Sequence, residues 1–255
     1  MNSFKAYIWK EYIELIRTKR IIVFAAVFLF FAILDPVMIK VLPMILKSQL
    51  QNITPEQMGI TQEAFAGLAS FAGDMFEIIT IVSVLTLMGI TAGERKEKTI
   101  VLPRIAGLKF EGTIIAKLLV NGLTLSVITV IAFCVSYLYS TLLFTESGGL
   151  YFKDALLSSL IYCVHFIFII ALCIFFGSGS SKGLYVSIMT ILIIFGGAAI
   201  SALLPKFKEY LPYFLIESGS KLKPDINALK SIGVTFALII LLSILSINKM
   251  KKTES

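Results

Sequence analysis

Residues 155–176 read ALLSSLIYCVHFIFIIALCIFF and contain no Asp, Glu, Lys or Arg. A helix needs about 20 mostly apolar residues to cross about 30 Å of hydrocarbon. This stretch meets that requirement, and five others do so as well. The alternating ten-residue strands of a membrane β-barrel are missing from the pattern. The sequence therefore predicts an all-α, polytopic membrane protein with six transmembrane helices, at about 21–41, 74–92, 114–143, 155–176, 183–204 and 231–248.

The composition agrees with this assignment. Of the 255 residues 57% are hydrophobic and 15% charged, and the mean hydropathy is +0.90. Soluble domains are about 45–50% apolar and about 25% charged, so the excess of apolar side chains is expected to face lipid. These values exclude a soluble enzyme, a disordered tail and a secreted scaffold. We expect one transmembrane domain over residues 1–255, in a cell membrane and most simply the bacterial cytoplasmic membrane.

The distribution of Lys and Arg predicts the orientation. The N-terminus, the 93–117 connection, the turn around Lys182 and the C-terminal tail together hold 15 of the 23 basic residues. Cytoplasmic segments are enriched in Lys and Arg, so both termini are predicted to be cytoplasmic. The net charge of +7 then reflects this bias and contact with anionic lipid. A nucleic-acid partner is not expected.

The first 20 residues are predicted to contain an amphipathic helix, over 3–17. Aromatic and aliphatic side chains fall on one half of this helix and most charges on the other, which is typical of a helix in the headgroup plane. Such an elbow helix either transmits force from a cytoplasmic partner or serves as a passive anchor. The elbow residues singled out are Trp9, Lys10, Glu14 and Arg17.

Two further segments are predicted to lie at the membrane surface. Residues 205–230 contain three prolines and an apolar stretch too short to span, so we expect an external re-entrant or interfacial segment there. Asp35, Asp74 and Glu77 are expected near the outer ends of their helices, where they either line an entrance or mark the helix end.

The connection between the second and third spans has the densest charge in the chain. Residues 93–119 read GERKEKTIVLPRIAGLKFEGTIIAKLL. Val101, Ile105 and Leu108 fall at i, i+4 and i+7, which predicts a short helix with one apolar face. A short amphipathic helix between charged flanks is typical of a docking surface for a soluble partner. We therefore expect residues 93–113 to form a cytoplasmic coupling loop.

This loop resembles the cytoplasmic motif of type-2 ABC (ATP-binding cassette) exporter permeases. In that family an acidic-Arg pair leads through Gly-Thr and a Pro turn to a Gly-Lys-Leu that enters the third helix. The present chain matches at Glu94, Arg95, Thr99, Pro103 and Lys117-Leu118. It departs at Lys98 and Ala116, where the family usually has glycine.

The resemblance implies a permease subunit that exports an unidentified substrate with ATP and Mg bound on a separate chain. Two cytoplasmic ABC ATPase subunits and a second permease copy, or a sister permease, would complete the transporter. No enzyme activity or cofactor is expected in this chain, because residues 177–183, GSGSSKG, do not match the G-x-x-x-x-G-K-[ST] phosphate loop. The implied ATPase-coupling residues are Glu94, Arg95, Lys98, Thr99, Val101, Pro103, Arg104, Ile105 and Leu108.

The sequence leaves alternatives to an ABC permease. An ion-gradient-driven secondary transporter usually has ionisable groups near mid-membrane, and the interiors of the predicted spans hold only His165 besides hydroxyl and thiol groups. An intramembrane enzyme would need a paired nucleophile and base, and a metal or disulfide site would need clustered ligands, neither of which is visible. A non-transporting membrane scaffold stays open. Hydroxyl groups of the second and fifth spans either line the transport path or bond within their own helices: Thr80, Ser83, Ser187 and Thr190.

Overall fold

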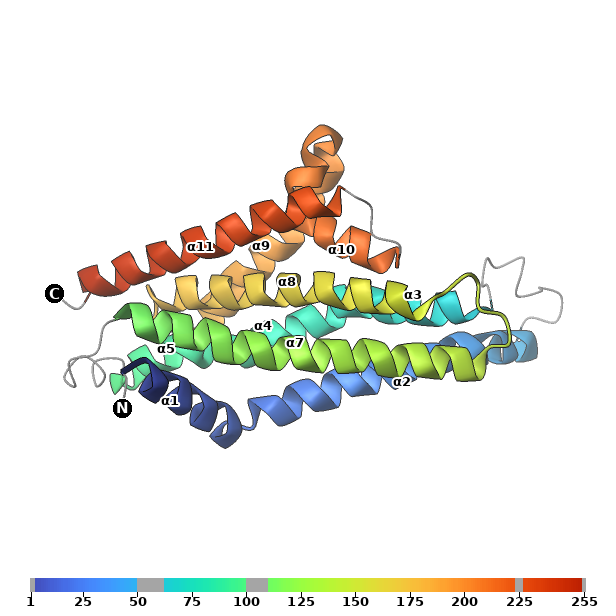
Figure 1. The fold of residues 1–255 in the computed structure, drawn as a ribbon, viewed down its shortest axis with the longest axis horizontal. Helices are drawn as coiled ribbons and strands as arrows, with labels where there is room; N and C mark the ends of the chain where they lie inside the picture. Colours follow the sequence, from blue (N-terminus) through green and yellow to red (C-terminus); the bar gives the residue numbers. More distant parts are fainter. Residues whose placement is uncertain (1–2, 50–61, 100–109, 223–226, 254–255) are drawn as a thin grey trace.

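The computed structural model describes residues 3–49, 62–99, 110–222 and 227–253. Within these residues the regular structure is entirely helical, and six helices are long and apolar enough to cross a membrane. They form an elongated bundle in which the start of the first helix and the end of the last lie at the same end (Figure 1). The prediction of an all-α chain with six spans is confirmed.

The six spans largely follow the apolar segments of the sequence. The first span lies within α2 (Arg20–Gln49), and the third to fifth are α7 (Phe110–Leu143), α8 (Phe152–Gly177) and α9 (Gly183–Leu203). The sixth lies within α11 (Ala228–Thr253). Large apolar side chains such as Leu123, Leu142 and Ile240 are exposed on their outer faces, as expected of helices that contact lipid.

The second span begins at Ala64, ten residues before its predicted start at position 74. It consists of α3 (Ala64–Asp74), the π-helical turn η2 (Met75–Ile79), α4 (Thr80–Leu87) and α5 (Gly89–Lys96). Small residues in α3 allow close packing, since a Cβ at Gly67 would lie 2.8 Å from Ser140 Oγ and 3.3 Å from the Pro36 Cα. The apolar stretch before Asp74 therefore extends the second span to Ala64.

Helix α8 is the most buried of the six spans and packs against α7, α11, α9, α10 and α5. Aromatic rings fill the space around it. The ring of Phe133 lies 5.2 Å from that of Phe71 and 5.5 Å from that of Tyr162, and the rings of Phe28 and Phe166 are 5.2 Å apart. These contacts fix α2, α3 and α7 around α8.

Two short helices join the fifth and sixth spans. They are η4 (Pro205–Tyr210) and α10 (Tyr213–Ser220). Helix α10 is too short to cross a bilayer, and it packs against α8 with Phe214, Leu215 and Ile216 buried. The predicted place of residues 205–230, at the external face or re-entering the bilayer, stays a prediction.

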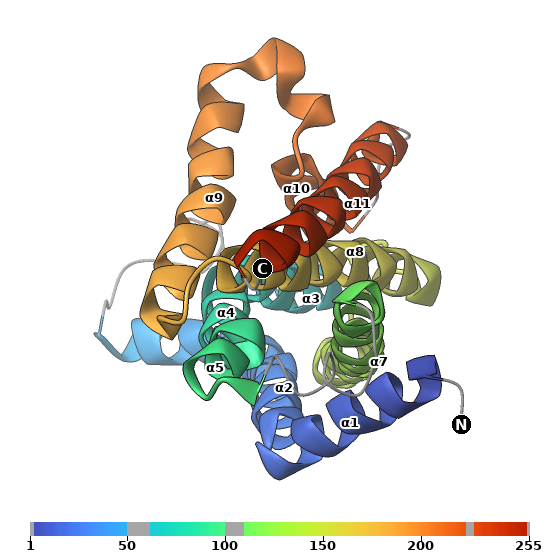
Figure 2. The same ribbon diagram turned by 90° about the vertical axis from the view of Figure 1, so that its left-hand side faces the viewer.

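Helix α1 (Ser3–Arg17) precedes the first span and meets it at a sharp turn. Lys19 has a φ of 55°, the left-handed conformation that ends many helices. Viewed from the end of the bundle that holds α1 (Figure 2), this helix lies across α2 and α7. The turn therefore brings the charged side chains of α1 against the ends of other helices.

Candidate coupling site

The motif residues of the 93–119 region meet at the end of the bundle that holds α1. Helix α5 carries Glu94 and Arg95. Lys98 and Thr99 come shortly after this helix, and Lys117 lies on α7. Five of the predicted coupling residues lie outside the residues that the structure describes: Val101, Pro103, Arg104, Ile105 and Leu108.

Glu94 and Lys117 form a buried ion pair. Lys117 Nζ lies 2.9 Å from Glu94 Oε1, and the exposed fractions of the two residues are 0% for Lys117 and 7% for Glu94. Glu94 is the acidic residue, and Lys117 the lysine, of the segment that resembles the cytoplasmic motif of ABC permeases. The pair therefore joins the end of the second span to the start of the third, at the base of the 93–113 loop.

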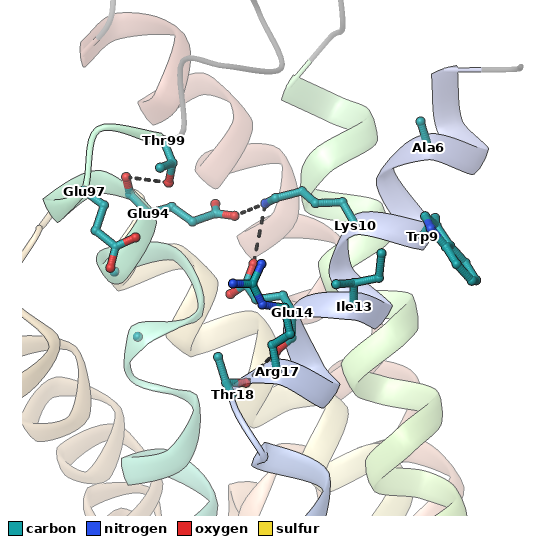
Figure 3. Close-up of a pocket in the computed structure, with 12 residues that line it drawn as sticks. Ala6, Trp9, Lys10, Ile13, Glu14, Arg17, Thr18, Glu94, Glu97 and Thr99 are labelled. Carbon is teal, nitrogen blue, oxygen red and sulfur yellow. Dashed lines mark hydrogen bonds and ion pairs between the residues drawn. The ribbon is translucent and has the colours of Figure 1, made fainter.

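Helix α1 supplies the remaining members of the network. Glu11, only 2% exposed, accepts a hydrogen bond of 2.9 Å from Lys117 Nζ. Lys10 donates to Glu94 and lies 3.2 Å from Glu11 Oε1 and 3.6 Å from Glu14 Oε2. Figure 3 shows Lys10 reaching between Glu94 and Glu14. The network thus ties α1 to both α5 and α7.

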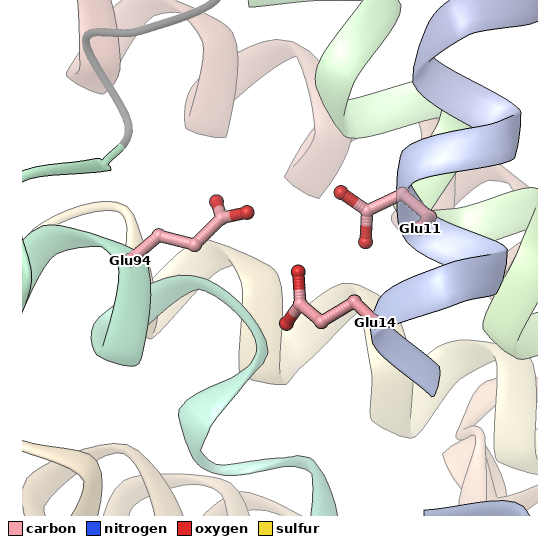
Figure 4. A group of neighbouring side chains, drawn as sticks. All are labelled: Glu11, Glu14 and Glu94. Carbon is pink, nitrogen blue, oxygen red and sulfur yellow. The ribbon is translucent and has the colours of Figure 1, made fainter. Parts of the chain in front are cut away.

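The charges of this network balance. The carboxylate oxygens of Glu11, Glu14 and Glu94 lie within 4.8 Å of one another (Figure 4). That spacing alone would suit a metal cation. However, the ammonium groups of Lys10 and Lys117 already contact these carboxylates, and Arg20 NH2 lies 3.5 Å from Glu14 Oε1. Three carboxylates facing three side-chain cations have no need of a metal ion. The arrangement is a structural ion-pair network.

The pKa of Lys10 reflects these neighbours. Burial acts to lower the pKa of this lysine, but the negative charges of Glu94, Glu11 and Glu14 outweigh it and raise the pKa above its usual value of 10.5. The ammonium group therefore stays charged at any physiological pH, and the contact between α1 and α5 does not depend on pH in that range.

Arg95 does not contribute to this network. Its guanidinium donates to the backbone carbonyl of Ser178, just beyond the end of α8. Glu94 is also held on the backbone side, because Thr99 Oγ1 donates to its carbonyl at 3.3 Å. The C-terminal end of α5 is thus fixed against α8 as well as α1. The guanidinium of Arg95 forms one of these contacts, a hydrogen bond within the chain.

Lys98 has a φ of 56° and is exposed. Residues with a Cβ rarely adopt this left-handed conformation, whereas glycine does so at little cost. The position is one at which the resembled motif usually has glycine. Lys98 thus adopts, just after α5, a backbone conformation that glycine favours.

A cavity of about 860 Å³ lies between α1 and α5, beside the network. Its rim includes the exposed apolar side chains of Trp9 and Ile13 and the carboxylate of Glu97 (Figure 3). All four predicted elbow residues line it: Trp9, Lys10, Glu14 and Arg17. A surface that combines apolar side chains with charges of both signs is suited to protein contacts.

The four hydroxyl residues suggested for the transport path are all buried. Thr80 Oγ1 lies 3.1 Å from His165 Nε2 and donates to Met75 O, and Ser187 Oγ donates to Leu184 O. Thr190 Oγ1 lies 3.8 Å from Cys173 Sγ, and Ser83 Oγ has no partner among the described residues. In this conformation they contact neighbouring helices or their own helix, and their role in transport stays a prediction.

The sequence alone indicates no role for Glu11, and it indicates Lys117 only through the motif. A signal for Lys117 was present, because a lysine at the edge of an apolar run is costly unless it finds a partner. For Glu11 the helical pattern placed the residue on the charged half of α1. No sequence pattern indicated that this half packs against α7.

Comparisons with protein-family models and with curated proteins find no match to this chain.

Proposed function

We propose that this chain is the permease subunit of an ATP-driven ABC exporter, located in a cell membrane and working with ATPase subunits on separate chains. The observation that carries the proposal is the buried pair of Glu94 and Lys117. These two motif residues close the base of the 93–113 loop, so that a force on the loop acts directly on two spans.

Three other features support this proposal. The elbow residues and the loop base line one cavity, which would let an ATPase contact both at once. Lys98, at a position where the resembled motif usually has glycine, adopts a left-handed backbone conformation that glycine favours. Six apolar helices provide the membrane domain.

The mechanism follows from the rigidity of these contacts. Nucleotide-driven closure of two ATPase subunits would displace the loop and α1 together, because Lys10, Glu11, Glu94 and Lys117 join them in one network. Buried ion pairs with good geometry resist separation. The displacement would then tilt the second and third spans relative to a second permease copy or sister permease and open an outward path.

Copurification tests the proposal. The tagged chain is purified from its own membranes with any ABC ATPase encoded beside it, with charges reversed at the loop by K98E and R104E. Arg95 is left unchanged because it binds Ser178 O within the chain. K182E, at an exposed lysine of another turn predicted to be cytoplasmic, is the matched control.

We expect the ATPase to copurify with the wild type and with K182E, and to be lost from the double variant. Undiminished binding to the double variant, or no ATPase with the wild type, would refute the coupling role of the loop.

A second candidate is an ion-gradient-driven secondary transporter. It is favoured by the carboxyl groups of Asp35 and Asp74, which lie within the first and second spans. Transport by the purified chain in vesicles without any ATPase, abolished by dissipating the ion gradient, would favour this candidate over the first.

A further inference from the structure

A second cavity, of about 470 Å³, lies within the membrane-spanning part of the bundle. The spans α8, α9 and α11 and the short helix α10 form its walls. Helices α9 and α11 both pack against α8 and α10, and the two spans diverge from each other on either side of α10 (Figure 2). Ligand pockets usually have volumes of about 300–1,000 Å³, so this cavity has room for a bound molecule.

Two adjacent glycines of α9, Gly196 and Gly197, keep the cavity open. A Cβ atom at either position would have no neighbour within 4 Å. Other residues that line the cavity have large apolar side chains that are exposed: Leu192, Ile200 and Leu241. Exposed apolar side chains on a membrane-spanning helix contact lipid. The cavity therefore opens sideways to the bilayer, and a molecule dissolved in the membrane can enter it.

The walls of the cavity carry no charge. Among the described residues that line it there is no Asp, Glu, Lys or Arg, and an ionised group without a partner in apolar surroundings is costly. The cavity therefore excludes charged groups such as phospholipid headgroups. Its polar side chains are His165 of α8, which is only 2% exposed, and Tyr213 of α10, whose ring packs 5.5 Å from that of Phe76.

The hydrogen bonds of Thr80 determine which nitrogen of His165 carries the proton. Thr80 donates its one hydroxyl proton to Met75 O at 3.0 Å, so its oxygen accepts from His165 Nε2 at 3.1 Å. The imidazole is neutral, because an unpaired buried charge is costly, and a neutral imidazole carries one N–H only. Nδ1 is then an acceptor, and no residue in the described part of the chain donates to it.

We propose that this cavity binds an uncharged lipid with one hydroxyl group, such as a long-chain alcohol. The hydroxyl donates to His165 Nδ1, whereas a plain acyl tail would leave this buried acceptor without a donor. The apolar body lies along Phe168 and Leu172, about one and two turns further along α8. On α9 the lining residues extend from Leu192 to Ile200, about 12 Å along the helix, which suits a chain parallel to the spans. This binding site goes beyond the proposed function and needs no ATPase partner.

Photo-cross-linking tests the location of the site. The probe is a long-chain alcohol that carries a diazirine in its chain, added to the purified full chain in lipid nanodiscs. Mass spectrometry is expected to find the label on α8, α9 and α11 at residues that line the cavity. Filling the cavity by G196L/G197L is expected to abolish this label. The matched control G73L/G233L, at two glycines with equally open surroundings outside the cavity, is expected to keep it. Label that is spread over lipid-facing residues outside the cavity, or equal in both double variants, would overturn the proposal.

Competition by unlabelled molecules tests the hydroxyl group. In the wild type the alcohol is expected to displace the probe at a concentration about two- to tenfold lower than its methyl ether, because the ether has no proton to donate. In H165F, which keeps an aromatic ring but has no acceptor, the alcohol and the ether are expected to compete equally. Equal competition in the wild type would overturn the proposal, even where a variant fails to fold. A preference for the alcohol that persists in H165F would also overturn it.

Discussion

The substitution K117M removes the central cation of the coupling network. Lys117 Nζ lies 2.9 Å from both Glu11 Oε1 and Glu94 Oε1, and the residue is fully buried. Removing one partner of a buried ion pair costs about 3–5 kcal/mol. Because Lys10 still contacts both carboxylates, we expect the lower end, about 3 kcal/mol. For a chain of this size that corresponds to a loss of about 6–12 °C in unfolding temperature.

The fluorescence of Trp9 is the assay, because it is the only tryptophan in the chain and lies on α1. K182M, at an exposed lysine, is the control. Adding E11Q to K117M restores part of the charge balance and is expected to recover about 1–2 kcal/mol in a double-mutant cycle. If K117M unfolds within about 1 °C of K182M, the network does not hold α1 in place, and this reasoning is wrong.

Three further predictions follow from local geometry. In α3, G67A is expected to cost about 1–3 kcal/mol, since its Cβ would lie 2.8 Å from Ser140 Oγ, whereas G73A, with open space around it, is expected to change stability by less than about 1 kcal/mol; equal effects in thermal unfolding would contradict this packing. K98G is expected to stabilise the turn after α5 by about 1 kcal/mol, because it relieves a φ of 56°; a measured loss of stability would count against that turn. At Glu217, burial acts to raise the pKa, but hydrogen bonds from Lys208 and Lys221 outweigh it and lower the pKa below 4.5. The ion pairs of Glu217 therefore contribute stability above about pH 4.5 that is lost as the pH falls further. E217Q is expected to lose less stability on acidification than the wild type, and an identical pH profile would refute the contribution.

The six spans were predictable from sequence because uninterrupted apolar length is a direct requirement of the bilayer. The start of the second span was not. The polar Asp74 suggested a helix end there, whereas Ala64–Asp74 packs its small residues against α2 and α7. Close packing of small residues depends on which helices become neighbours, and hydropathy along the chain does not contain that information.

The candidate site was predictable only in part, because local sequence patterns do not specify contacts between distant helices. The motif and the amphipathic pattern indicated the elbow residues and the loop, and the structure brings the elbow residues together with Glu94 and Thr99 around one cavity. The ion pairs of Glu11 and Lys117 join residues far apart in sequence, so no local pattern specified them.

The proposed function requires that an ATPase hold the 93–113 loop on the cytoplasmic side of the membrane. Cross-linking from position 98 tests it most directly, with K98C placed in a variant whose three native cysteines are replaced by alanine. In native membranes we expect K98C to react with a membrane-impermeant thiol reagent only from the cytoplasmic side and to cross-link to an ABC ATPase, with K208C, predicted to be external, doing neither. Labelling of K98C only from outside, or an ATPase cross-link at K208C instead, would refute the proposed coupling role of the loop.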